Sequence, residues 1–274
     1  MVLIRTSGDR LSHVALGEFG GKALFVKEIE EALLGGEVDV GVHSLKDLPA
    51  ELPAECCLTA FPPREDPRDV LVTRTGAAPS ELPERAVVGT SSLRRRVLLL
   101  AHRPDLRVEP IRGNVQTRLG RLESGAYDAI VLALAGLRRL GLTPPHTVVL
   151  PAEEFVPAVG QGILGLEARA ADGPARELLG RLDHGPTRKV AEAERAFLHR
   201  LDAGCHAPVA GHARLDGDLL SLTGLVASAD GGTVLRGSIC GVASSAEALG
   251  QELADRLLAR GARRLLDEAE GRGA

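Results

Sequence analysis

The sequence predicts an α/β protein made of two α/β domains and a C-terminal α+β domain with a small antiparallel sheet. Strand-like and helix-like segments alternate between residues 24 and 134, a pattern that implies a largely parallel sheet. A proline-rich hinge at residues 62–67 separates two such units. After residue 201, short strand-like segments are joined by Asp-Gly turns, which is typical of an antiparallel sheet. The 274 residues suffice for two or three domains at roughly 100–200 residues each.

In the first unit, apolar residues recur at helical spacing over residues 24–34, and the glycines at 35–36 end this helix. Residues 38–42 alternate between valine and a small or polar residue, and are predicted to form a strand. Residues 43–47 follow as a loop, which Pro49 stops. Open α/β sheets bind their ligands at the carboxyl ends of strands. We therefore expect this loop to lie at a ligand site.

The second unit has the order strand, helix, strand, helix, strand. Its expected elements are residues 86–89, 93–102, 106–111, 115–122 and 129–134, with Thr90, Ser91 and Ser92 available to cap the first helix and Gly125 closing the second. A return crossing, a long amphipathic helix, three short strands and a last helix are expected after it. These span residues 150–157, 187–201, 213–215, 219–226, 233–240 and 246–266.

Arginine is concentrated in the second unit, although the whole chain carries a net charge of −4. Nine arginines between residues 85 and 121 face only Asp105 and Glu109, which leaves a local charge of +7. A guanidinium holds a carboxylate or a phosphate bidentately, so this segment favours an anionic ligand. Aromatic residues make up 2% of the chain, which argues against a base-stacking surface for single-stranded nucleic acid.

The compartment is predicted from what the sequence lacks. It contains no apolar stretch of about 18 residues, and its first residues do not form a signal-peptide pattern. The four cysteines suggest neither a disulfide scaffold nor a zinc site; they are Cys56, Cys57, Cys205 and Cys240. We therefore expect a cytoplasmic protein in a reducing compartment, with no metal site and no membrane partner.

The same polar chemistry follows two neighbouring strands of the second unit. Hydroxyl groups, exposed N–H groups and the helix dipole favour an anion at such strand ends. Any one of these arginines is more simply explained as a solvated surface charge. Their repetition at two strand ends favours a ligand with several carboxylates or phosphates. The residues are Thr90, Ser92, Arg94 and Arg95 after the first strand, and Arg112 and Arg118 after the second.

Two further positions carry groups that could react or bind. In the first loop, Lys46 could hold an anionic group and Asp47 a cationic or N–H-rich one, although an acid beside a lysine is common on any surface. Cys205 lies just beyond the long helix, and Gly204 and Pro208 around it indicate a loop that presents the thiol. The thiolate would be the nucleophile. Inert packing is the alternative role for a lone cysteine.

These segments together resemble the porphobilinogen deaminase family. The motifs occur in the family's order over essentially the whole chain, and jointly they are highly specific. They are residues 5–9, 20–30, 42–49, 64–69, 89–95, 112–119, 157–162 and 204–205. The resemblance implies a transferase of porphyrin and haem biosynthesis that deaminates four porphobilinogen molecules and joins them into hydroxymethylbilane. It also implies that the first two domains are similar to the halves of type II periplasmic binding proteins.

The resemblance assigns roles to individual residues. It implies a dipyrromethane cofactor, linked by a thioether to Cys205, on which the chain grows. Asp47 is the expected catalytic residue, because its carboxylate would face the pyrrole N–H groups and the developing positive charge. The residues expected to bind the cofactor are Cys205, Ser44, Lys46, Asp47, Thr90, Ser92, Arg94, Arg95, Arg112, Gly136 and Gln161. Those expected to bind substrate are Lys22, Phe25, Arg112, Arg118 and Arg139.

The expected domain boundaries rest on the same resemblance. Domain 1 comprises residues 1–62 and 158–182, domain 2 residues 68–157, and domain 3, with the cofactor cysteine, residues 183–274. Family members normally begin about 35–40 residues earlier, so a strand of domain 1 and a substrate-binding arginine and serine are expected to be missing. A monomer is expected.

Two other classes of protein share parts of this pattern. A non-catalytic cytosolic binding or sensor module for a polycarboxylate would use the same arginines, without a cofactor on Cys205. A nucleic-acid-binding protein would use the arginine-rich segment against phosphates, with strongly salt-dependent binding. The strand-end placement of the arginines and the low aromatic content argue against this second class.

Overall fold

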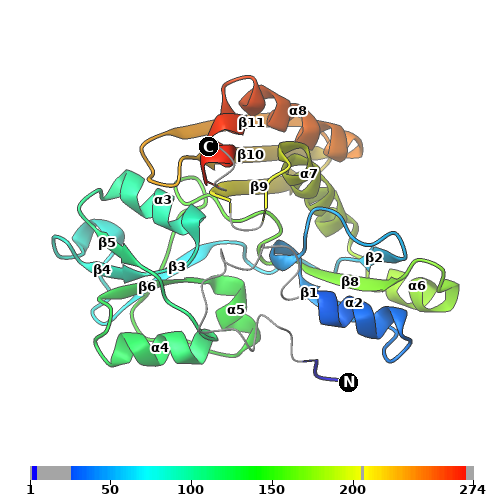
Figure 1. The fold of residues 1–274 in the computed structure, drawn as a ribbon, viewed down its shortest axis with the longest axis horizontal. Coiled ribbons are helices and arrows are strands. Elements are labelled where there is room, and N and C mark those ends of the chain that lie inside the picture. Colours follow the sequence, from blue (N-terminus) through cyan, green and yellow to red (C-terminus); the bar gives the residue numbers. More distant parts are fainter. Residues whose placement is uncertain (1, 5–25, 205–206, 270–274) are drawn as a thin grey trace.

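The computed structural model describes residues 2–4, 26–204 and 207–269 and consists of three lobes, each built around one sheet (Figure 1). Two lobes mix helices with strands, and the third combines an antiparallel sheet with helices, which confirms the predicted fold class. The domain boundaries given above stay a prediction. Within the described ranges, no helix is long and apolar enough to cross a membrane.

The first lobe has a three-stranded antiparallel sheet in the order β1-β8-β2. One helix of this lobe packs against β1 and β8, and another packs against β2 and β8. The predicted strand at 38–42 was placed too early, because pairing begins where Gly41 lies opposite Glu167. His43 and Ser44 therefore belong to the strand, and the expected loop shrinks to one 3-10 turn. The elements are α2 (Lys27–Leu34), β1 (Gly41–Ser44), η2 (Leu45–Asp47), β2 (Cys56–Ala60), β8 (Leu164–Arg169) and α6 (Gly173–Gly180).

The second lobe has a mixed five-stranded sheet in the order β5-β4-β6-β3-β7. β4 pairs in parallel with β5 and β6, so the three strands predicted for this unit are parallel, whereas β3 is antiparallel to both β6 and β7 and makes the sheet as a whole mixed. A parallel neighbour requires a crossover connection, whereas β3 enters directly from the hinge and runs against β6 and β7. The elements are β3 (Asp69–Thr73), η3 (Pro79–Glu81), β4 (Val87–Gly89), α3 (Leu93–His102), β5 (Arg107–Glu109), α4 (Val115–Glu123), β6 (Ala129–Ala133), α5 (Leu134–Arg139) and β7 (Thr147–Val149).

The third lobe is an antiparallel meander in the order β11-β10-β9, which confirms the three predicted strands. The single helix predicted at 246–266 is wrong, because Gly261 adopts φ +96° and divides it in two. Gly250 allows α8 to approach α7 closely, since a Cβ there would lie 2.3 Å from the carbonyl O of Ala193. The elements are α7 (Gly185–Leu201), β9 (Val209–Asp216), β10 (Leu219–Ala227), β11 (Val234–Val242), η4 (Ala243–Ser245), α8 (Ala246–Leu258) and α9 (Ala262–Ala269).

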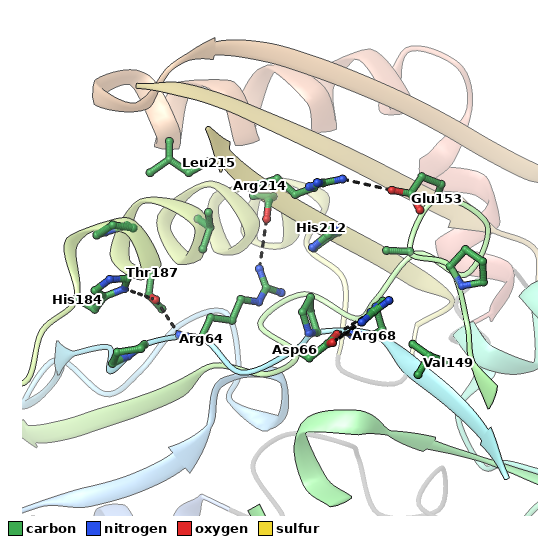
Figure 2. Close-up of a pocket in the computed structure, with 17 residues that line it drawn as sticks. Arg64, Asp66, Arg68, Val149, Glu153, His184, Thr187, His212, Arg214 and Leu215 are labelled. Carbon is green, nitrogen blue, oxygen red and sulfur yellow. Dashed lines mark hydrogen bonds and ion pairs between the residues drawn. The ribbon is translucent and has the colours of Figure 1, made fainter. Parts of the chain in front are cut away.

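A buried ion pair joins the three lobes. The carboxylate of Glu194, on α7, is fully buried and accepts a hydrogen bond from Arg64 Nη1 at 2.7 Å. It also accepts from the backbone N–H groups of Gly160 at 2.6 Å and Ala213 at 2.7 Å. Arg64 belongs to the hinge, Gly160 to the return crossing, which in the structure runs over residues 150–163 between β7 and β8, and Ala213 to β9. Figure 2 shows Arg64 pointing from the hinge towards the third lobe.

Replacing this carboxylate should destabilise the whole protein. In Glu194→Ala the largely buried Arg64 guanidinium loses its carboxylate partner, and two backbone N–H groups lose their acceptor. We expect the free energy of unfolding to fall by about 3–5 kcal/mol, measured by urea denaturation. Glu252→Ala is the matched control, because Glu252 forms an exposed ion pair with Arg256 on the same lobe and should cost less than about 0.5 kcal/mol. Equal losses in the two variants would contradict this prediction.

Candidate active site

The end of β1 presents three of the predicted residues to one edge of the first lobe. Along β1 the side chains alternate, so His43 is buried against Glu167 at 2.8 Å while Ser44 is exposed. The 3-10 turn then leaves Lys46 half-buried and Asp47 exposed. Ser44 and Asp47 both border a small cavity of about 140 Å³. The strand end is therefore open, and its expected role as a ligand site stays a prediction.

The return crossing holds this turn from behind. The backbone N–H of Leu45 donates to the carbonyl O of Ile163 at 3.0 Å. Gly160 adopts φ +72°, and a Cβ there would lie 3.0 Å from the backbone N of Lys46. Only glycine combines this left-handed conformation with so close an approach. The turn that carries Asp47 is thus packed directly against the segment that links the lobes.

Arg94 and Arg95, at the start of α3, converge on one carboxylate of the second lobe. Nη1 of Arg94 lies 2.8 Å from Asp69 Oδ2, and Nη2 of Arg95 lies 2.7 Å from Asp69 Oδ1. The two arginines are only 4% and 8% exposed, and Asp69 is 1% exposed. Arg94 also donates to the carbonyl O of Val156 at 2.8 Å, and Arg95 to that of Val131 at 3.1 Å. Both arginines are therefore held rigidly by protein acceptors.

Gln161 connects this group to the turn in the first lobe. Its Nε2 donates to Asp69 Oδ1 at 2.8 Å and to the carbonyl O of Pro67 at 2.7 Å. Its Oε1 lies 3.4 Å from the Nζ of Lys46. With 1% of its surface exposed, Gln161 is an internal bridge between the two α/β lobes. The structure thus brings together four predicted residues, namely Lys46, Arg94, Arg95 and Gln161.

The charges of this group are not balanced. Burial raises the pKa of Asp69, but the charges of Arg94 and Arg95 outweigh it and hold that pKa well below its usual range. Burial lowers the pKa of Lys46. The attraction of Asp47 raises this pKa by a smaller amount, and repulsion from Arg95 lowers it. Burial and repulsion from Arg95 lower the pKa of Arg118, against the attraction of Asp47. Among the described residues of this group, four cations (Lys46, Arg94, Arg95 and Arg118) thus face two carboxylates (Asp47 and Asp69). This leaves two positive charges in excess, which favours an anionic ligand.

One buried donor in this group is unsatisfied. Nε of Arg94 has no hydrogen-bond partner among the described residues, although its Nη1 binds both Asp69 and Val156. A buried guanidinium N–H without an acceptor costs free energy. An added carboxylate would supply that acceptor.

The hydroxyl groups of Thr90 and Ser92 are used within the turn before α3. Thr90 is 5% exposed, and its Oγ1 accepts from the backbone N–H of Ser92 at 3.2 Å. Ser92 caps α3 by accepting from the backbone N–H of Arg95 at 3.4 Å, which confirms the predicted cap. Their expected contact with a ligand stays a prediction.

The remaining predicted residues are dispersed. Arg118 donates to the carbonyl O of Gly113 at 2.7 Å, and Asp47 influences its pKa, so it belongs to the central group. Arg112 is half-buried on the loop between β5 and α4. Arg139, at the end of α5, donates to the carbonyl O of Gly162 at 2.7 Å, and the acidic group that influences its pKa is Glu65. Gly136 faces open space on α5. Lys22, Phe25 and Cys205 lie outside the described residues.

Asp69 is the member of this group that the sequence did not lead us to single out. It opens β3, where the next three residues are apolar and almost fully buried. A single acid at the start of such a strand is the signal that could have found it, because a buried carboxylate requires cationic partners. The partners themselves lie on α3, 25 and 26 residues further along the chain.

A larger cavity of about 730 Å³ lies elsewhere, between the hinge, the crossing and β9 (Figure 2). None of the predicted site residues lines it. Its arginines are paired internally: Arg68 with Asp66 at 2.6 Å and Arg214 with Glu153 at 3.3 Å. Because its charges are balanced and those around Asp69 are not, we assign the candidate active site to the Asp69 group.

Replacing Arg95 by lysine should cost stability despite the unchanged charge. The guanidinium makes three bonds, two to Asp69 and one to Val131, and a single ammonium cannot reproduce this planar fork. We expect Arg95→Lys to lower the free energy of unfolding by about 1–3 kcal/mol in urea denaturation. Arg96→Lys is the control, because Arg96 is the exposed neighbour on the same helix and should change little. A silent Arg95→Lys would mean that the Asp69 group is not rigid.

The family models cover most of the chain. Residues 1–177 match the model described as "Porphobilinogen deaminase, dipyromethane cofactor binding domain", and residues 189–259 match "Porphobilinogen deaminase, C-terminal domain". Among solved structures, the periplasmic aliphatic sulphonate binding protein SsuA from Escherichia coli gives a TM-score of 0.39 at 16% identity. That match covers 63% of this chain and 56% of that one, so the likeness is weak.

Curated relatives match over nearly the full length. A porphobilinogen deaminase from Nitratidesulfovibrio vulgaris (strain DP4) is 51% identical over 273 residues, covering 99% of this chain and 87% of the relative. One from Desulforudis audaxviator (strain MP104C) is 52% identical over 263 residues, covering 96% and 85%. With both family models and these identities in agreement, the chain belongs to the porphobilinogen deaminase family.

Proposed function

We propose that this protein is a hydroxymethylbilane synthase, a transferase that deaminates four porphobilinogen molecules and joins them into hydroxymethylbilane on a covalently bound dipyrromethane primer. The family membership supports this activity. The observation that carries it in the structure is the excess of buried and half-buried positive charge beside an exposed carboxylate, Asp47. Porphobilinogen and dipyrromethane both bear several carboxylates and pyrrole N–H groups, which are complementary to these two features.

The residues present fit dipyrromethane. The unsatisfied Nε of Arg94 and the two excess positive charges call for acceptor oxygens at this place. When bound, dipyrromethane would supply the pyrrole carbon on which the product is built. We propose that its acetate and propionate groups are held by Ser44, Lys46, Thr90, Ser92, Arg94, Arg95, Arg112, Gly136 and Gln161, with Cys205 as the point of attachment.

Asp47 is proposed as the catalytic residue. Its carboxylate is exposed at the strand end, where it can accept hydrogen bonds from the pyrrole N–H of the substrate. As ammonia leaves porphobilinogen, positive charge develops on that ring, and a fixed carboxylate stabilises it. Lys46, the next residue back, is held by Gln161 and turned towards the arginines, so the two neighbouring charges serve different groups.

Substrate carboxylates are proposed to bind on the second lobe, at Arg112, Arg118 and Arg139, together with Lys22 and Phe25. Arg118 supports this assignment best, because it lies close enough to Asp47 for the carboxylate to influence its pKa. Arg118 and Arg139 each donate one hydrogen bond to a backbone carbonyl, which orients the guanidinium. We further propose a cytoplasmic monomer without nucleic-acid or membrane partners, on the basis of composition and charge.

A covalent cofactor should be visible in the intact mass of the purified protein. We expect a dipyrromethane increment, and peptide mapping should place it on Cys205. Among the other cysteines, burial and the charge of Glu167 raise the pKa of Cys56 to about 11, which keeps its thiolate scarce. Cys205→Ser should remove the increment, whereas Cys240→Ser, on exposed β11, should retain it. An adduct mapped to Cys56, Cys57 or Cys240 would contradict the assignment.

Neutralising Asp47 should abolish most turnover and leave the fold intact. Its side chain is exposed, so Asp47→Asn should change the melting temperature little. The lost electrostatic stabilisation should cost on the order of 3 kcal/mol, or about a hundredfold in kcat. Asp47→Glu keeps the charge one methylene further out and should retain a fraction of the activity.

Asp39→Asn serves as the control for Asp47, since Asp39 is an exposed acid of the same lobe outside the site. We expect it to keep wild-type turnover. Undiminished turnover in Asp47→Asn would remove Asp47 from the mechanism, and a collapsed melting temperature would give it a structural role instead.

A further inference from the structure

One helix, α7, connects the Asp47 turn to the segment that contains Cys205. It ends at Leu201, four residues before Cys205 in the sequence. Earlier along the helix, Arg195 Nη2 donates to the carbonyl O of Ala50 at 2.7 Å and to that of Pro49 at 3.2 Å. These two carbonyls follow Asp47 by only two and three residues. A side chain of the third lobe thus holds the backbone next to the proposed catalytic residue.

A second contact, one helical turn further along α7, reinforces the first. His199 Nε2 lies 2.9 Å from Glu51 Oε1, although both side chains are exposed. Below these polar contacts, Leu45 and Leu48, which flank Lys46 and Asp47, belong to the same buried apolar cluster as Leu201 at the end of α7. The Asp47 turn is therefore anchored to α7 by apolar packing and by hydrogen bonds to its backbone.

The other end of α7 is held equally well. The carbonyl O of Leu201 accepts from Arg263 Nη2 at 2.6 Å, and Asp202 ends the helix in the left-handed region at φ +49°. Ala203 and Ala207 are buried in the same cluster, and the Ala207 N–H donates to the carbonyl O of Gly204 at 3.0 Å. The chain on both sides of residues 205–206 is thus fixed relative to α7.

We propose that Arg195 is a positioning residue, which fixes the backbone that follows Asp47 and thereby the place of the Asp47 carboxylate in the site. This inference rests on the proposed role of Asp47. Arg195 itself acts through the backbone at residues 49–50. A charged donor with two carbonyl acceptors gives strong and directional hydrogen bonds. Because a displacement of about 1 Å at a reacting centre can cost about a hundredfold in rate, this contact controls turnover without touching substrate.

The test compares Arg195→Ala and Arg195→Lys with wild type and with Arg200→Ala. Arg200 lies on the same helix and pairs with Asp255 at 2.6 Å, away from the Asp47 turn. We expect Arg195→Ala to load the cofactor normally by intact mass, to lower kcat by about 10–100-fold and to change KM less than about threefold. Lysine can reach one carbonyl and should restore part of kcat, while Arg200→Ala should behave as wild type.

A double-mutant cycle with Asp47→Glu tests whether Arg195 acts through Asp47. If it does, Arg195→Ala should lower kcat by a clearly smaller factor in the Asp47→Glu background than in wild type. Equal factors in both backgrounds, or a wild-type kcat in Arg195→Ala, would overturn the proposal. So would a loss of kcat that is matched by a loss of cofactor loading, because that would assign Arg195 to cofactor binding or to folding.

Hydrogen exchange separates this inference from the proposed function. The backbone amides of Asp47, Leu48, Ala50 and Glu51 should exchange faster in Arg195→Ala than in Arg200→Ala, whether or not the protein turns over porphobilinogen. Faster exchange with no cofactor mass and no turnover in wild type would refute the proposed function alone. Unchanged exchange at 47–51 would refute the contact's positioning role. If Arg195→Ala does not fold, the same measurements on Arg195→Lys decide the outcome, since its loss of one hydrogen bond should still raise the exchange.

Discussion

Glu194 is a fully buried carboxylate, and a buried charge must find its hydrogen-bond donors inside the protein. It finds them on three segments that are distant in sequence: the hinge, the return crossing and β9. The position of each lobe therefore depends on the same two oxygen atoms. Hinge and crossing pass side by side here, because the carbonyl O of Gly162 accepts from the Glu65 N–H at 3.0 Å. Everything that the lobes form jointly, including the candidate active site, rests on this junction.

In the candidate active site, buried charges are paired in the same way, but positive charge exceeds negative charge. At the junction one guanidinium and two N–H groups satisfy one carboxylate, whereas around Asp69 two guanidinium groups share a single carboxylate. Asp69 orients Arg94 and Arg95 and offsets part of their desolvation cost, but it does not neutralise them. The remaining positive charge, together with Lys46 and Arg118, is what a ligand with several carboxylates would compensate. Gln161 holds the charged groups of the two lobes in place relative to each other, since it binds Lys46 and Asp69 at once.

Much of the local structure could be predicted because its signals are local. The helix at 93–102 has its cap, its apolar spacing and its end within a dozen residues, and the structure has the same bounds. The Asp-Gly turn before β10 and the basic segment of the second unit are equally local, and Gly217 indeed adopts φ +58°. The family motifs identified the strand ends that carry Lys46, Arg94 and Arg95, and the structure brings these side chains to one place.

The tertiary structure alone decided how these pieces face one another. The residue at which a strand begins depends on its partner. β1 begins at Gly41 because β8, far along the chain, pairs with it there. Asp69 gives no sign in the sequence of which arginines it will meet, since ion pairing is set by the packing of α3 on the sheet. The sequence by itself determined the family, the capped helices and the chemistry of the strand ends. Only folding decided which of those groups are buried, paired or left in excess, because burial and pairing are properties of distant contacts and not of local spacing.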